Sequence, residues 1–308
     1  MLDSSLTESL IAGCCTLLLV FLLFEIVDWI EVFTWPENDE NILPTFSFGY
    51  AHKNGPHTWK DLYPESAGNN QSPINISTRY AIVVQPSEPL RWSSYNSSPL
   101  SMSLSNDGHT VTLRGIWTET SWPQLHGGPL SNKYDVFNIL FHWGPCNQEG
   151  SEHTLDYIRF PMELQVIHIK HGIKSPKDAI ILGARDGIVI VSFFLQVSAM
   201  DNPYLDHIVS NLWRIIKPNS KVNIPPFPLE WIFAPFDRDY YTYNGSLSQP
   251  PCSEIVTWII QKEPIVISAL QVERFRKICS VDGPLLLNCR PVQPLNERDI
   301  YFYEESKS

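Results

Sequence analysis

Short apolar or alternating stretches, separated by turn-forming residues, recur along most of the chain. Five of them predict strands, at residues 110–113, 136–143, 164–169, 188–197 and 255–260. Alternation with a period of two is typical of strands with one buried face, and short continuous apolar runs fit strands buried on both faces. Two stretches look helical, 202–216 and 268–278, and Ser268 and Gln271 open the second in a capping-box arrangement. We therefore expect a mainly β domain with peripheral helices.

An apolar run at residues 10–27 precedes this pattern. Its length lies between the roughly 20 residues of a membrane span and the roughly 10 to 14 of a signal-peptide core. No Lys or Arg comes before Lys53, so charge does not indicate an orientation. We interpret residues 1–34 as an N-terminal segment that carries a candidate anchor or signal. A membrane anchor is favoured, a cytoplasmic protein with an untethered extension comes next, and a secreted protein is third.

Residues 35–44 are polar and bounded by prolines, which predicts a linker, and residues 45–308 are expected to form the domain. A chain of 308 residues with 43% hydrophobic residues can bury one large core. The net charge of -11 argues against a nucleic-acid partner, because binding a phosphate backbone needs a basic face. The six cysteines include no C-x-x-C pair, so we expect free, mostly buried thiols.

Several motifs resemble the α-carbonic anhydrase family. The segment 138–144 reads Asn-Ile-Leu-Phe-His-Trp-Gly, and 162–168 reads Met-Glu-Leu-Gln-Val-Ile-His. Further similar motifs lie at residues 71–76, 106–109, 243–247 and 290–295. The resemblance runs from about Phe48 to Phe302. It implies the fold of that family, a central twisted and mostly antiparallel sheet with a zinc ion at the bottom of a cone.

The resemblance places Leu140, His142 and Gln165 at the three positions where the family has zinc-binding histidines. Side chains alternate along strands, so Leu140 and His142 should share one face and converge with Gln165. A catalytic zinc needs three protein ligands, and neither a hydrocarbon nor a neutral amide is a suitable one. We therefore expect no metal and no other cofactor. A looser zinc site of His142 with Glu163 or His168 remains an alternative, although His168 should face away from Glu163.

The resemblance also implies a vestigial pocket around these positions. Its outer residues are Asn138 and Glu163, of which Glu163 matches the carboxylate that orients a ligand histidine, and its catalytic remnants are His109, Glu152, Ser248 and Gln249. His109 matches a proton-shuttle histidine, and Glu152 matches the carboxylate that holds the hydroxyl now supplied by Ser248. We expect Glu152, Glu163, His153 and His168 to form a structural hydrogen-bond network. Ile167 and Ile190 replace smaller valines and should narrow the pocket.

These expectations favour an acatalytic carbonic anhydrase-related protein that serves as a protein-binding or regulatory module. Its partner would be an unidentified protein, with a possible membrane tether through residues 10–27. The alternative is a zinc-dependent carbonate dehydratase with weak residual activity, or a weak esterase. Ser248 has no histidine placed by the sequence to activate it as a nucleophile.

Overall fold

The computed structural model describes residues 48–233 and 239–304. The predicted N-terminal segment at 1–34, its apolar run at 10–27, the linker at 35–44 and the domain boundary at residue 45 lie outside these ranges and stay predictions. Within them, no helix is both long enough and apolar enough to cross a lipid bilayer.

A thirteen-stranded sheet dominates the part of the chain that the structure describes. Its main path runs β11-β4-β5-β7-β9-β10-β13-β12-β17-β2, with β3, β6 and β14 paired alongside. The strands of this sheet are β2 (Ile82–Val84), β3 (Arg91–Ser93), β4 (Ser101–Asn106), β5 (Val111–Ile116), β6 (Gln124–Gly127), β7 (Leu130–Trp143), β9 (Met162–Lys170), β10 (Ile188–Ser198), β11 (Ser220–Ile224), β12 (Tyr240–Gly245), β13 (Val256–Gln261), β14 (Ile265–Ser268) and β17 (Tyr301–Tyr303). Two small two-stranded sheets join β1 (Asn75–Ile76) to β8 (Thr154–Leu155) and β15 (Cys279–Ser280) to β16 (Gly283–Pro284).

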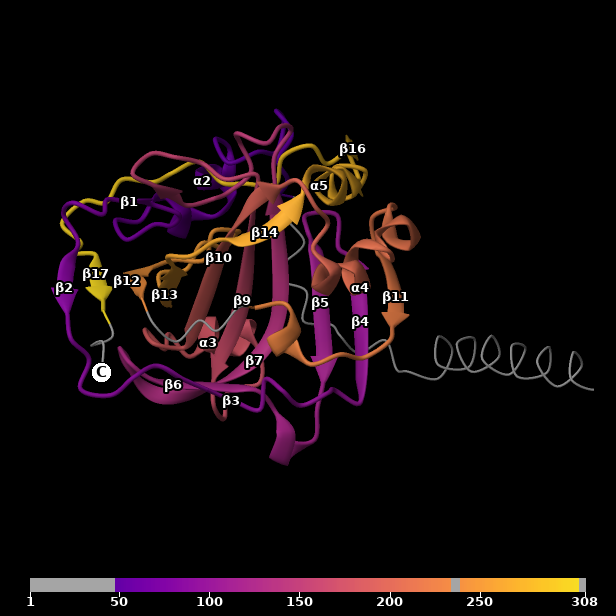
Figure 1. Cartoon of the computed structure of the whole chain (residues 1–308). Coiled ribbons are helices and arrows are strands. Elements are labelled where there is room, and N and C mark those ends of the chain that lie inside the picture. Colours follow the sequence, from indigo (N-terminus) through magenta and orange to yellow (C-terminus); the bar gives the residue numbers. More distant parts are fainter. Residues whose placement is uncertain (1–47, 234–238, 305–308) are drawn as a thin grey trace, which may run out of the picture. The chain divides into compact units, whose positions relative to one another are not determined.

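The predicted fold class is confirmed. All five predicted strands are present, as β5, β7, β9, β10 and β13. Most pairings in the large sheet are antiparallel. The parallel ones are those of β10 with β13 and β14 and that of β17 with β2. Figure 1 shows β7, β9 and β10 in the middle of the sheet, with β2 and β17 towards one side and β4 and β11 towards the other.

Short helices lie around this sheet. The α-helices are α2 (Trp59–Leu62), α3 (Pro176–Ile181), α4 (Asp206–Val209) and α5 (Ala269–Phe275), and the 3₁₀ helices are η1 (Pro64–Ala67), η2 (Glu119–Ser121), η3 (Pro203–Leu205), η4 (Leu212–Ile215) and η5 (Leu229–Trp231). The predicted capping box is confirmed, because the Ser268 hydroxyl accepts from the Gln271 backbone and the Gln271 side chain accepts from the Ser268 backbone. The helix it starts ends at Phe275, three residues before the predicted end.

The single helix predicted at 202–216 is wrong, since this segment forms η3, α4 and η4 in succession. The break between α4 and η4 falls at Ser210 and Asn211. The Ser210 hydroxyl donates to the carbonyl of Asp206, and the Asn211 amide donates to the carbonyl of His207. Such side chains compete with the backbone for helical carbonyl groups, which explains why the apolar periodicity overestimates the helix.

The four cysteines in the described ranges, Cys146, Cys252, Cys279 and Cys289, are free thiols. Cys252 and Cys289 are buried, whereas Cys279 is partly and Cys146 fully accessible. Burial raises the pKa of Cys252 to about 12, so this thiol stays protonated at neutral pH. The prediction of free thiols is confirmed for these four.

Strand β9 separates two hydrophobic clusters. Leu164 and Val166 pack into one cluster and Ile167 into the other, as the alternation of side chains requires. His168 lies on the face of Leu164 and Val166, where Tyr95 donates to its Nε2 and its Nδ1 donates to the Val166 carbonyl at 3.0 Å. The expectation that His168 joins Glu152 and Glu163 is therefore wrong, because it lies on the opposite face.

Burial lowers the pKa of His168 from 6.5 to about 3, so the ring is neutral in the folded protein. A folded-state pKa below the unfolded value contributes stability above pH 6.5 that is lost as pH falls towards 3. Lowering the pH from 7.5 to 5 should therefore cost the wild type about 2 kcal/mol of unfolding free energy through this residue. His168→Gln should lack that contribution in urea titrations at the two pH values. An equal loss in both proteins would contradict the assignment.

Candidate functional site

The register of the central strands defines the site. Leu140 of β7 lies directly opposite Gln165 of β9, and His142 lies opposite Glu163 one pair further along. Ser192 of β10 continues the first row on the far side of Gln165. Pairs two residues apart share a face, so the structure brings Leu140, His142 and Gln165 together on one face of the sheet.

Gln165 is the centre of a buried polar cluster. Its side chain is 1% exposed, and its Nε2 donates to Glu152 at 2.8 Å and to Glu163 at 3.0 Å. Both amide hydrogens are thereby used on two carboxylates that are themselves fully buried. The amide thus supplies a hydrogen bond to each of two charges that water does not reach.

Glu163 is held by further donors. The backbone N–H and the Nδ1 of His153 donate to its two oxygens at 2.8 and 2.9 Å, and the Ser192 hydroxyl donates at 2.7 Å. Burial alone would raise the pKa of Glu163, but the charge and hydrogen bond of His153, with His142 and Ser192, lower it to about 2. The carboxylate is therefore ionised at neutral pH, and its low pKa depends on these surrounding donors.

Glu152 has a different set of partners from the one expected. Its Oε1 accepts from the backbone N–H of Arg290 at 3.0 Å, and its Oε2 accepts from Gln165. Ser248 is buried at 5% exposure, but its hydroxyl is not among these donors. Gln249 donates to the Tyr50 hydroxyl at 3.1 Å. The hydroxyl that should gate a metal-bound water is thus not held by the carboxylate expected to hold it.

His142 is fully buried, and its Nδ1 lies 2.8 Å from the carbonyl oxygen of Asn288. A carbonyl can only accept, so Nδ1 donates in this bond, and Nε2 is the ring nitrogen left for a further partner. That Nε2 is buried without a hydrogen-bond partner, and so is the Oδ1 of Asn138 two positions before Leu140. Within residues 48–233 and 239–304, no group of three or more His, Cys, Asp or Glu side chains could hold a metal ion.

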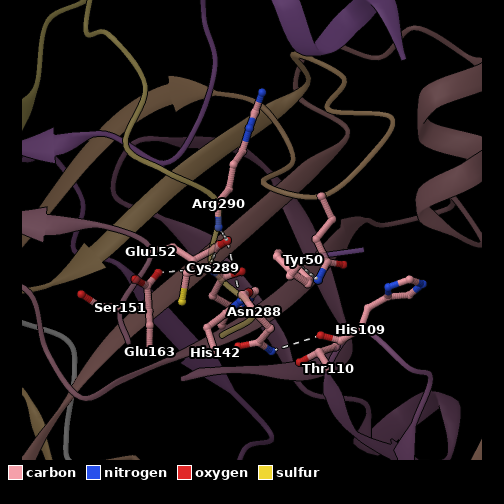
Figure 2. A network of polar contacts seen from close by, with 12 residues as sticks. Tyr50, His109, Thr110, His142, Ser151, Glu152, Glu163, Asn288, Cys289 and Arg290 are labelled. Carbon is pink, nitrogen blue, oxygen red and sulfur yellow. Dashed lines mark hydrogen bonds and ion pairs between the residues drawn. The ribbon is translucent and has the colours of Figure 1, made fainter. Parts of the chain in front are cut away.

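His109 lies apart from this cluster. Figure 2 shows its ring directed away from His142. The ring stacks on Phe48 with centroids 4.0 Å apart and an interplanar angle of 11°. Burial lowers the pKa of His109, although Asp107 and Asp282 act in the other direction. The predicted shuttle residue is therefore turned towards the segment around Phe48.

The apolar wall is present as expected from the resemblance. Ile167 and Ile190 are direct partners across β9 and β10, and both are nearly inaccessible to solvent. Leu140 is half-buried and packs against the cluster that contains them. Hydrocarbon thus occupies the face next to the unpartnered His142 nitrogen.

Sequence reasoning missed two residues that organise the site, Asn288 and Arg290 (Figure 2). Asn288 contacts His142 through its carbonyl, and its side chain accepts from the Trp143 backbone N–H at 2.8 Å. The Arg290 guanidinium is buried and donates to Gln71 and to the carbonyl of Ser72, both at 2.8 Å. Arg290 is the first residue of the motif at 290–295, and this motif could have identified it as part of the site. Nothing in the local sequence identifies Asn288.

The comparisons with known proteins identify the family of this chain. The model of the eukaryotic-type carbonic anhydrase family matches residues 54–304. Carbonic anhydrase 3 of Homo sapiens is 33% identical over 82% of this chain and 96% of its own length. Carbonic anhydrase 7 of Mus musculus is 35% identical over 82% and 95%. The carbonic anhydrase-related protein of Rattus norvegicus is 36% identical over 78% and 85%.

Replacing Gln165 by leucine should destabilise the protein by about 2 to 3 kcal/mol, because each buried carboxylate loses a donor. Gln261→Leu is a matched control in the same sheet. Gln261 is also buried, at 5% exposure, but its Nε2 has no hydrogen-bond partner. Urea unfolding at pH 7.5 measures both changes. If Gln261→Leu costs as much as Gln165→Leu, the loss reflects packing rather than the bonds to Glu152 and Glu163.

Proposed function

Because the chain belongs to the eukaryotic-type carbonic anhydrase family, whose active members hold zinc through three histidines, we propose that it is an acatalytic member that acts as a protein-binding or regulatory module. The observation that carries this proposal is the donor set at the three ligand positions. It consists of one imidazole, one hydrocarbon and one amide whose nitrogen is already bound to two carboxylates.

These residues do not fit a catalytic zinc. The ion takes nitrogen, sulfur or carboxylate oxygen from three protein side chains and leaves one position for water. Leu140 has no lone pair, and Gln165 offers a neutral amide oxygen, which is a poor zinc ligand. In active carbonic anhydrases, the reference example of this effect, zinc lowers the pKa of bound water from about 15.7 to about 7. Hydration of carbon dioxide at neutral pH should therefore be negligible here.

The proposal of a binding module rests on a fold that is complete without the ion. The carboxylates Glu152 and Glu163 obtain donors from the protein itself, so these two buried charges need no metal ion beside them. Such a rigid domain can present its surface to another protein. The similarity to the rat carbonic anhydrase-related protein supports this reading, and the net charge of -11 disfavours nucleic acid as the partner.

The rival function is a zinc-dependent carbonate dehydratase with weak residual activity, which family membership alone would suggest. Elemental analysis of the purified full chain and stopped-flow hydration after incubation with zinc separate the two. We expect less than one tenth of an equivalent of zinc and a rate equal to the buffer blank. Zinc near one equivalent that resists washing with chelator, or hydration that azide abolishes, would overturn the acatalytic proposal.

Restoring the two missing ligands should restore the metal. Leu140→His with Gln165→His supplies three imidazoles on one face, and Asn138 Oδ1 and Glu163 are acceptors available to orient the new rings. We expect about one equivalent of zinc in the double variant, with measurable hydration activity. Each single variant serves as a control and should bind zinc at least about tenfold more weakly, because it has only two histidines. A folded double variant that binds no zinc would contradict the assigned ligand positions.

Partner binding should not depend on the metal site. The full chain, used as bait against extract from its native source, should retain a specific protein that an unrelated acidic bait does not retain. The double variant Leu140→His, Gln165→His should retain the same protein to within about twofold, because Gln165 is buried and Leu140 is half-buried. Failure to recover any specific protein would count against the binding-module proposal, while the zinc measurements would still stand.

A further inference from the structure

A short loop before α2 holds two exposed histidines, His52 and His57, in a fixed arrangement. The Asn54 carbonyl accepts from the Gly49 backbone N–H at 2.9 Å and from the Trp59 indole at 3.0 Å. Trp59 is 1% exposed, so this bond ties the loop to the protein interior. The loop therefore has little freedom between the two histidines, which lie on either side of Asn54 in the sequence.

The two imidazole rings lie close to each other on the surface. Their centroids are 5.4 Å apart and their planes are inclined by 52°, so the rings are not stacked. Both residues are exposed to solvent. With metal–nitrogen bonds of about 2.0 to 2.1 Å, two imidazoles that share one tetrahedral ion have ring centres roughly 5 Å apart. The observed spacing thus matches two ligands of one metal ion.

The charges around the pair also suit a cation. Lys53, the residue between the histidines that carries a positive charge, is bound to Asp282 at 2.6 Å. The Asn54 amide donates to the same carboxylate at 2.8 Å. The ammonium group is therefore neutralised and directed to the turn between β15 and β16. A chain with a net charge of -11 adds a favourable field for a divalent cation.

We propose that His52 and His57 form a surface site for a divalent transition-metal ion of the nickel, copper or zinc type. Imidazole nitrogen is the preferred ligand of these ions, and affinity rises from nickel to copper. Among the described residues, no third His, Cys, Asp or Glu completes a three-residue group. Water fills the remaining positions, so the ion is exchangeable. This site is separate from the sheet and does not rest on the proposed function.

The test is a calorimetric titration of the full chain, free of any histidine tag and washed with chelator, with Ni²⁺ at pH 7.5. We expect one ion per chain in the wild type. Either His52→Gln or His57→Gln should weaken binding by at least about tenfold, because the second ligand acts at high effective concentration only while the first is present. Circular dichroism before each titration verifies that the variants are folded.

His171→Gln is the matched control. His171 is also exposed, but its Nδ1 is bound to Asp135 at 2.8 Å. This variant should bind Ni²⁺ as the wild type does. The site is overturned if the wild type binds no Ni²⁺, if His52→Gln and His57→Gln keep affinities within twofold of the wild type, or if His171→Gln loses affinity equally. A failure here would leave the zinc measurements on Leu140 and Gln165 unaffected.

Discussion

The pair of hydrogen bonds from Gln165 to Glu152 and Glu163 is the interaction on which the rest of this site depends. Two buried carboxylates, Glu163 on β9 and Glu152 in the loop before β8, would carry a large desolvation cost without donors. The amide satisfies one oxygen of each, and the backbone N–H groups of His153 and Arg290 satisfy the opposite oxygens. The acidic shell of a metal enzyme can therefore persist in the interior with a neutral side chain at its centre.

His142 has a structural explanation of its own. Its Nδ1 is bound to the Asn288 carbonyl, and the neighbouring Trp143 is bound to Asn288 through its backbone and to the Leu285 carbonyl through its indole. These contacts join the end of β7 to a segment about 145 residues later in the chain. A buried histidine with one satisfied nitrogen is thus useful to the fold, and its presence alone is no sign of metal binding.

The apolar and alternating runs were enough to predict the central strands, and the period of two was enough to place Leu140 and His142 on one face. That Gln165 converges with them was implied by the resemblance to the family. The partners of Gln165 were not predictable, since they depend on how a flexible side chain settles between Glu163 of its own strand and Glu152 of the loop before β8. The orientation of His109 was missed for a similar reason, because its stacking partner Phe48 is 61 residues away in the sequence. The prediction of a single helix at 202–216 was wrong for a local reason, because the side chains of Ser210 and Asn211 donate to backbone carbonyls and interrupt the helix.

Metal affinity and catalytic rate are separable properties of this fold. A histidine at position 165 would release Glu152 from the amide that now donates to it. Nothing in that change would turn His109 away from Phe48, where its ring is stacked and its Nδ1 is buried without a partner. The side chain expected to carry the proton to solvent, His109, would still be directed elsewhere. General acid–base groups typically contribute about 10²- to 10⁴-fold to the rate. Under the proposed function, rebuilding the ligands should therefore recover zinc binding more completely than turnover, because turnover also depends on the orientation of His109.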